Sequence, residues 1–165
     1  MTQSFASKAR FPAEYGDPGD SALVPWSEVE DKLRAASNYW LATVNPDGRA
    51  HVRPVDGVWV DGALCFGGSH ETRWVRNLQA NPAVTVNLAS EAEAIILEGA
   101  TELITDPEHP LARPSTEASV KKYPQYYTDG KVPPFQPFWA FRPKRAFAWT
   151  LEGFPRSATR WRFDP

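Results

Sequence analysis

Hydrophobic residues recur at two spacings along the chain, and each spacing predicts a different element. Residues 27–37 place apolar side chains three or four positions apart behind a Ser27-x-x-Glu30 capping box, which predicts a helix with Ser27 as its N-cap. Residues 69–80 show the same spacing, with Ser69 as the expected N-cap and Asn81-Pro82 as the stop. We therefore expect two amphipathic helices.

Most of the remaining segments are rich in β-branched and aromatic residues and predict strands. Turn sequences at 45–48 and 61–62 join the first strands as antiparallel hairpins. Gly99, inside an apolar run, indicates a bulge or bend. A proline-interrupted stretch at 106–127 is expected to be helical in parts. The expected strands are 39–44, 49–60, 63–68, 83–88, 94–104, 138–141 and 145–150.

This order of elements predicts a mainly β fold. Six or so short antiparallel strands, with a helix between the fourth and fifth, favour a small, partly open barrel over a doubly wound sheet, because no βαβ unit repeats. The length of 165 residues corresponds to one domain. We assign it to residues 25–165, after an irregular arm at 1–24 that is rich in Gly, Pro, Asp and Ser.

Composition narrows the class of protein. The net charge of −2 gives no global field for nucleic acid, so an anion site would have to be local. One cysteine and three scattered histidines predict neither a disulfide nor a metal site. The chain has no signal-peptide pattern and no apolar run long enough to span a bilayer. We therefore expect a cytoplasmic protein that binds neither membrane nor nucleic acid.

The best candidate site is the predicted junction between a strand and a helix at residues 66–73. Gly67 and Gly68 would allow close backbone approach, and Thr72 and Arg73 would add a hydroxyl and a guanidinium at a helix N-terminus, which attracts anions. Arg53, on a nearby strand, could point to the same place. The alternatives are an ordinary glycine-containing strand end and a surface arginine.

No motif for side-chain catalysis accompanies this site. The sequence has no nucleophile elbow, Walker loop, dinucleotide fingerprint or carboxylate pair. His51 could act as a general base, although a lone histidine on a strand is more often packed or exposed to solvent. If the protein is an enzyme, a bound cofactor would therefore carry the reaction.

The run ATVNPDGRAHVRPVDGVWVDGALCFGGSHETRWVRNLQANPAVTV resembles the pyridoxamine 5′-phosphate oxidase-like split-barrel flavoproteins, which include the actinobacterial deazaflavin-dependent reductases. The resemblance covers roughly residues 39–105 and, more loosely, FRPKRAFAWT near the end. It implies a six-stranded antiparallel split barrel that forms a homodimer, with two cofactor sites at the interface. The expected cofactor is FMN, with coenzyme F420 as the alternative.

The family also implies which residues hold the cofactor. Its flavin phosphate is bound by an arginine on the second strand and by a Ser/Thr-Arg-Lys run that opens a helix, and the ring lies along the backbone that follows the arginine. The closing strands of the partner subunit complete the site. The matching positions are Arg53, Pro54, Val55, Gly67, Gly68, Thr72 and Arg73 in one subunit and Trp149 and Arg160 in its partner.

Departures from the family pattern change the expected activity. Trp74 and Val58 stand where the oxidases have lysines, and residues 156–160 replace the stretch that binds pyridoxamine phosphate. We therefore expect an oxidoreductase that transfers hydride between FMN or F420 and a small organic substrate other than pyridoxamine phosphate. No catalytic side chain is assigned. The alternatives are a split barrel that binds flavin or haem without catalysis, and a dimeric scaffold without a cofactor.

Overall fold

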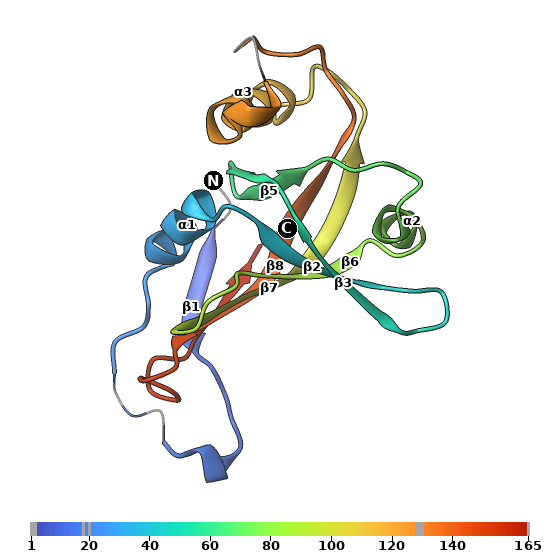
Figure 1. The fold of residues 1–165 in the computed structure, drawn as a ribbon. Helices are drawn as coiled ribbons and strands as arrows, with labels where there is room; N and C mark the ends of the chain where they lie inside the picture. Colours follow the sequence, from blue (N-terminus) through green and yellow to red (C-terminus); the bar gives the residue numbers. More distant parts are fainter. Residues whose placement is uncertain (1–2, 18, 20, 128–130, 165) are drawn as a thin grey trace.

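The computed structural model describes residues 3–17, 19, 21–127 and 131–164, and in this part of the chain it is mainly β, with three α-helices (Figure 1). All strand pairs are antiparallel. The strands are β1 (Ser4–Lys8), β2 (Tyr39–Val44), β3 (Ala50–Val55), β4 (Val58–Val60), β5 (Ala63–Phe66), β6 (Ala83–Asn87), β7 (Glu93–Ile104), β8 (Phe138–Thr150) and β9 (Thr159–Phe163). The helices are α1 (Trp26–Ala35), α2 (Arg73–Ala80) and α3 (Ala112–Lys122), with short 3₁₀ turns η1 (Ala13–Tyr15) and η2 (Pro124–Tyr126).

The strand pairings run in a circuit. β3 pairs with β2, β2 with β6, β6 with β7, β7 with β8, β8 with β5 and β5 with β4. The circuit closes because β4 follows β3 after only Asp56 and Gly57. This arrangement agrees with the expected antiparallel, mainly β fold. Two further strands extend the sheet beyond β8, in the order β8, β9, β1.

The predicted turns and the predicted bulge are confirmed. Asp61 and Gly62 both have positive φ, as a tight hairpin turn requires, and Gly48 has a φ of 84°. The β7–β8 register shifts between Glu98 and Gly99. A Cβ at Gly99 would lie 2.0 Å from the carbonyl oxygen of Arg142, so the close approach of the two strands requires glycine.

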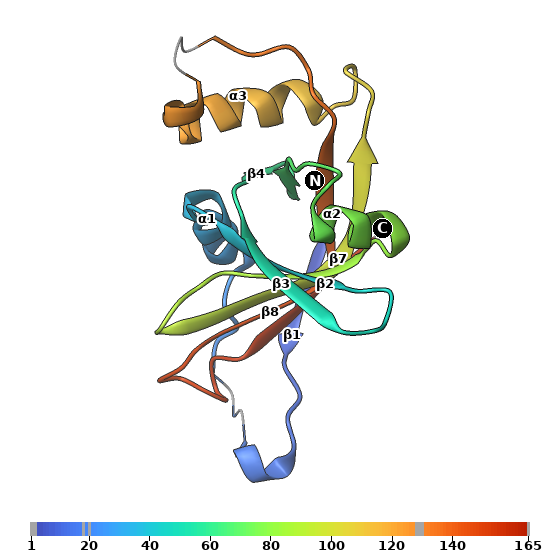
Figure 2. The ribbon, with the colours of Figure 1, turned by 45° about the vertical axis from the view of Figure 1, so that its right-hand side comes forward.

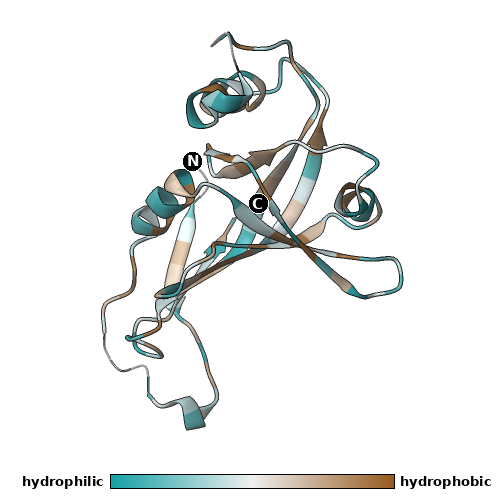
Figure 3. Cartoon of the chain, viewed as in Figure 1, coloured by the Kyte–Doolittle hydropathy of each residue, from teal (hydrophilic) through white to brown (hydrophobic). Residues whose placement is uncertain are grey.

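The core lies inside this circuit of strands. Tyr39, Leu41, Phe141 and Trp161 are almost fully buried, and Leu33 of α1 packs against them. Figure 3 shows hydrophobic colour on β5, whose four residues are all buried, and hydrophilic colour on much of α1 and α3. The helices thus cover the barrel with one face each and expose the other.

At both ends of the chain the structure differs from a prediction. The arm at 1–24, expected to be irregular, contains β1, which pairs with β9 from Ser4 opposite Phe163 to Lys8 opposite Thr159. Short strands with polar residues carry a weak local signal, and this one forms through a partner more than 150 residues away. Residues 1–2, 18 and 20 of the arm lie outside the described residues. The two closing strands expected at 138–141 and 145–150 are one strand, β8, which continues through Pro143 at the bulge.

Both predicted helix starts are corrected as well. α1 begins at Trp26 after Pro25, so Ser27 is inside the first turn and no side chain caps the helix. α2 begins at Arg73. Ser69 instead forms a separate turn: its hydroxyl accepts a hydrogen bond from the Glu71 N–H (3.2 Å), and its carbonyl accepts one from the Thr72 N–H (3.0 Å). Serine favours such local turns as readily as helix caps.

Helix α3 is fixed to the break between β3 and β4 (Figure 2). The Tyr123 hydroxyl lies 2.8 Å from the Gly57 carbonyl oxygen, to which it donates, and 2.9 Å from the Gly57 nitrogen, from which it accepts. The Lys122 ammonium donates to the same carbonyl (2.8 Å) and to the Tyr39 hydroxyl (3.1 Å). Desolvation in this half-buried position lowers the pKa of Lys122 to about 8. The interrupted strand is thereby held by a helix from another part of the chain.

Candidate functional site

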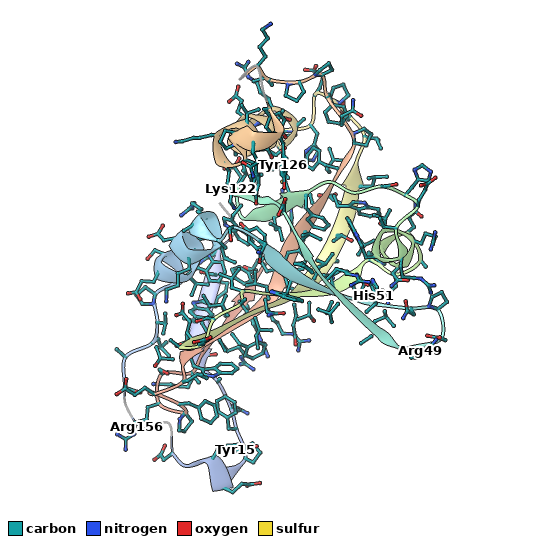
Figure 4. The ribbon with its side chains drawn as sticks, viewed as in Figure 1. Tyr15, Arg49, His51, Lys122, Tyr126 and Arg156 are labelled. Carbon is teal, nitrogen blue, oxygen red and sulfur yellow. The ribbon has the colours of Figure 1, made fainter. Side chains whose placement is uncertain are left out.

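Two of the predicted phosphate ligands, Arg53 and Arg73, lie in the same region. Arg53 is exposed on β3, and Arg73 is the exposed first residue of α2. His51 is close to both: its pKa is lowered by partial burial and then by the positive charges of Arg53 and Arg73. Figure 4 shows His51 on the hairpin that projects beside α2. The structure therefore brings two guanidinium groups and an imidazole from two elements into one region.

The third predicted phosphate ligand, Thr72, directly precedes α2. Its hydroxyl donates to the Ser69 carbonyl oxygen at 2.7 Å, so the Ser69 turn orients this side chain in the present structure. The start of a helix carries the positive end of the helix dipole, which favours an anion there. To bind a phosphate, Thr72 would have to turn its hydroxyl proton from the Ser69 carbonyl to an anion oxygen, beside the helix terminus.

Trp74 occupies the position where the oxidases have a lysine, and in this structure its ring packs against neighbouring residues. A Cβ at Gly68 would lie 2.1 Å from the Trp74 ring, and Phe66 packs against the same ring with centroids 5.8 Å apart. The indole therefore takes the space beside Gly68 that was expected to admit a ligand. Gly67 has no heavy atom within 4 Å of an added Cβ and remains open.

Val58 also faces the protein interior. It is 3% exposed and belongs to a second apolar cluster with Cys65, Leu111 and Tyr123, which explains why a lysine is not accommodated at this position. Burial raises the pKa of the Cys65 thiol to about 12, so this cysteine is an inert core residue. Val55 is buried too, whereas Pro54 is exposed on the opposite face of β3.

Asn77 is a site-supporting residue that the sequence analysis did not identify. It is 1% exposed, and its amide nitrogen lies 3.0 Å from the Thr43 hydroxyl and 3.1 Å from the Asn45 side-chain oxygen. These bonds attach α2 to the β2–β3 hairpin and so hold Arg73 near Arg53. A buried asparagine inside a helix gives no sequence pattern that would reveal this connection.

Trp149 and Arg160, the residues expected from a partner, lie far from Arg53. Trp149 packs against Phe11 and Phe154, with ring centroids 6.3 and 5.9 Å away. Figure 4 shows the neighbouring residues Tyr15 and Arg156 at the lower end of the molecule, well separated from His51 at the right. One subunit therefore does not bring all the predicted cofactor residues together.

The two ends are nevertheless connected by one face of the sheet, which we call the outer face. Residues that pair directly across antiparallel strands point to the same side. One row of such pairs crosses seven strands, and its members are Pro54, Trp40, Asn87, Ile96, Phe147, Arg160 and Ser7. Pro54 and Arg160 thus lie on the same face, five strands apart.

Other features of the described residues lie away from this region. A cavity of about 1190 Å³ between α1, the β4–β5 turn and the β7–β8 bulge includes none of the predicted site residues. No group of three or more potential metal ligands occurs in the described part of the chain. No helix there is both long and apolar enough to cross a membrane.

Comparison with solved structures shows the same fold in several proteins of low sequence identity. A conserved hypothetical protein, Rv2991 from Mycobacterium tuberculosis, has a TM-score of 0.64 and 18% identity over 82% of this chain and 89% of its own. HutZ, the haem storage protein of Vibrio cholerae, has a TM-score of 0.59 and 17% identity over 75% and 92%. An F420 reductase has a TM-score of 0.50 and 25% identity over 69% and 91%.

Sequence comparison identifies the family. Among curated proteins, none matches this sequence. The family model described as pyridoxamine 5′-phosphate oxidase matches residues 26–150, which is most of the chain and includes β2 to β8 together with all three α-helices. With the circuit of antiparallel strands and the structural neighbours, this match shows that the chain belongs to the pyridoxamine 5′-phosphate oxidase-like, FMN-binding split-barrel family.

Proposed function

We propose that this protein is a homodimeric oxidoreductase that transfers hydride between FMN, or alternatively coenzyme F420, and a small organic substrate. The observation that carries the proposal is the meeting of Arg53 and Arg73 beside His51 and the start of α2. Two exposed guanidinium groups and a helix terminus form a suitable receptor for a phosphate group.

Except at Gly68, beside which the Trp74 ring lies, the residues present are of the type that each expected role requires. Arg53 and Arg73 would bind the phosphate, with the Thr72 hydroxyl and the open Gly67 backbone beside them. The backbone of Pro54 and Val55 would run along the ring. When bound, the cofactor supplies the hydride chemistry, and the protein supplies orientation and electrostatics. The missing lysines at 58 and 74 leave this site with fewer positive charges than the oxidases have.

The outer face supports the homodimer. Trp40, Ile96 and Phe147 are only partly buried there, and Val52, on the neighbouring row, is 45% exposed. A twofold axis near the middle of the row would bury these side chains against their copies. The same rotation would place Arg160 and Trp149 of one subunit over Pro54 of its partner. A dimer would therefore unite the two groups of predicted residues that one subunit keeps apart.

Binding of flavin or haem without catalysis is the second candidate. It is supported by HutZ, a haem storage protein with the same fold. It is also supported by His51, because a lowered pKa keeps its imidazole neutral, and the neutral form is the one that binds metal. Arg53 and Arg73 would then face the carboxylates of the haem.

The visible spectrum of the freshly purified protein separates these functions. Bands near about 370 and 450 nm that bleach on reduction would support flavin, whereas one intense band near about 400 nm would indicate haem. A colourless protein would be titrated with FMN and F420. Failure to bind either cofactor would contradict the oxidoreductase proposal. Binding without turnover of any electron donor or acceptor would favour the non-catalytic function.

A further inference from the structure

We propose that β1, the segment after it and β9 form an anion-binding subsite that receives a phosphate or carboxylate group. Ser7, Lys8, Ala9, Arg10, Phe11 and Arg160 line a pocket of about 490 Å³. Three of these residues are cations and none is an acid. Apart from Arg160, they lie in the arm expected to be irregular, and all six are outside the segment that matches the family.

Arg160 provides the first argument. Its Nε atom is buried and has no hydrogen-bond partner among the described residues. Leaving a charged donor buried and unpaired is costly, so native proteins normally satisfy such groups with a partner, a water or a ligand. The neighbouring strands do not supply an acid: Arg160 pairs with Ser7 of β1 and with Phe147 of β8.

The second argument is the charge around the pocket. The Lys8 ammonium donates to the Ser21 hydroxyl (2.7 Å) and to the Arg156 carbonyl oxygen (3.0 Å), which are both neutral, and no acid among the described residues forms an ion pair with it. Arg10 is exposed and forms no ion pair with any described residue. Three positive charges around one small pocket attract an oxyanion, and an arginine fork binds it with directional hydrogen bonds.

The third argument is the position of Phe11. The ring of this pocket residue is nearly perpendicular to the Trp149 ring, and its centroid lies 4.8 Å from that of Phe154, so Phe11 joins an aromatic cluster to the cationic pocket. Such a combination suits a ligand with a flat apolar part and a terminal anionic group. The group could belong to a free small oxyanion or to the end of a larger ligand.

Inorganic phosphate tests the subsite without reference to the flavin. We expect calorimetric titration of the full-length protein to show phosphate binding that is weakened about tenfold or more in Arg160→Gln and Arg10→Gln. Arg160→Lys should restore part of the affinity. Arg162→Gln is the matched control, because Arg162 is an exposed β9 residue that does not line the pocket, and it should bind like the wild type. Circular dichroism would confirm that each variant is folded.

The result that overturns the proposal is equal phosphate affinity in wild type and in folded Arg160→Gln and Arg10→Gln proteins. Loss of phosphate binding in Arg53→Ala alone would also overturn it, because the anion would then bind at the other end of the sheet. Repeating the titration on protein saturated with FMN or F420 distinguishes the source. Blocked phosphate binding would assign the pocket to the anionic end of the cofactor, and unchanged binding would assign it to a separate oxyanion. If no cofactor binds at all, the phosphate result still stands by itself.

Discussion

Pro54 on β3 and Arg160 on β9 lie at opposite ends of one row of paired residues on the outer face of the sheet. Five strand spacings separate them, which is roughly 24 Å along the sheet. A single small cofactor cannot contact both residues in one subunit. If both act on the cofactor, the sites must therefore be shared between two subunits.

A charged side chain introduced on the outer face should prevent two subunits from sharing their cofactor sites. We expect Phe147→Glu to convert the dimer into monomers, because the carboxylate would be buried without a partner at the interface. Sedimentation velocity would measure the change, and FMN affinity should fall with it. Val132→Asp, an exposed loop position outside the outer face, is the control and should leave the association unchanged. A monomeric wild-type protein would rule out shared sites.

Neutralising the phosphate site should weaken cofactor binding. Arg53→Ala and Arg73→Ala should each raise the Kd for FMN about tenfold or more, since each removes a charge-assisted hydrogen bond of about 1.5–3 kcal/mol. Flavin fluorescence titration would measure the Kd of each variant. Arg49→Ala is the control: Arg49 lies on the same hairpin but pairs with Asp47. Wild-type affinity in both site variants would show that the phosphate binds elsewhere.

Gly68 and Trp74 should be energetically coupled. From the sequence alone, Trp74→Lys would be expected to tighten FMN binding by restoring the family charge. The packing of Trp74 on Gly68 and Phe66 now predicts a cost in stability of about 1–3 kcal/mol for this change, as for loss of other partly buried aromatics. Gly68→Ala should also destabilise the protein, because its Cβ would collide with the indole.

A double-mutant cycle tests this coupling. In the Trp74→Lys background the alanine at position 68 meets a flexible side chain, so Gly68→Ala should cost much less there than in the wild type. Urea unfolding followed by circular dichroism would give the four free energies. Strictly additive effects would mean that the two residues act independently.

Lys122 should make stability depend on pH. Its pKa is about 8 when folded and about 10.5 when unfolded, so the unfolded chain binds more protons between these values. The unfolding free energy of the wild type should therefore rise, relative to Lys122→Met, as the pH increases from 7.5 to 9.5. Cys65 has the opposite effect: burial raises its pKa in the folded state, so the unfolding free energy falls as the pH rises above 9. Because both proteins contain Cys65, the comparison cancels this effect. Lys121→Met, at an exposed neighbouring position, should not show this difference.

Local patterns predicted most of the barrel. The strands between Tyr39 and Ile104, the turn at Asp61-Gly62 and the bulge at Gly99 follow from local sequence patterns. The break at Asp56 and Gly57, which divides the strand expected at 49–60 into β3 and β4, was not predicted. β1 was missed because its pairing with β9 is non-local. The start of α2 was misplaced because Ser69 stabilises a separate turn, and the start of α1 because this helix begins directly after Pro25 without a side-chain cap.

The candidate site was predictable only in part. The residue types at Arg53, Thr72 and Arg73 identify an anion site once the family resemblance is known. The pattern does not show that Asn77 joins α2 to the hairpin, because one buried amide has no periodicity. It does not show that Trp74 fills the space beside Gly68 either, since only the three-dimensional distance reveals the contact.

The attachment of α3 to Gly57 has a consequence for local unfolding. Gly57 lies in the gap between β3 and β4, and its N–H is bonded to the hydroxyl of Tyr123, which is 66 residues away in sequence. Its protection against exchange with solvent deuterium therefore depends on the docking of α3. The exchange rate of this one amide reports how often the helix lifts from the barrel, independently of global unfolding.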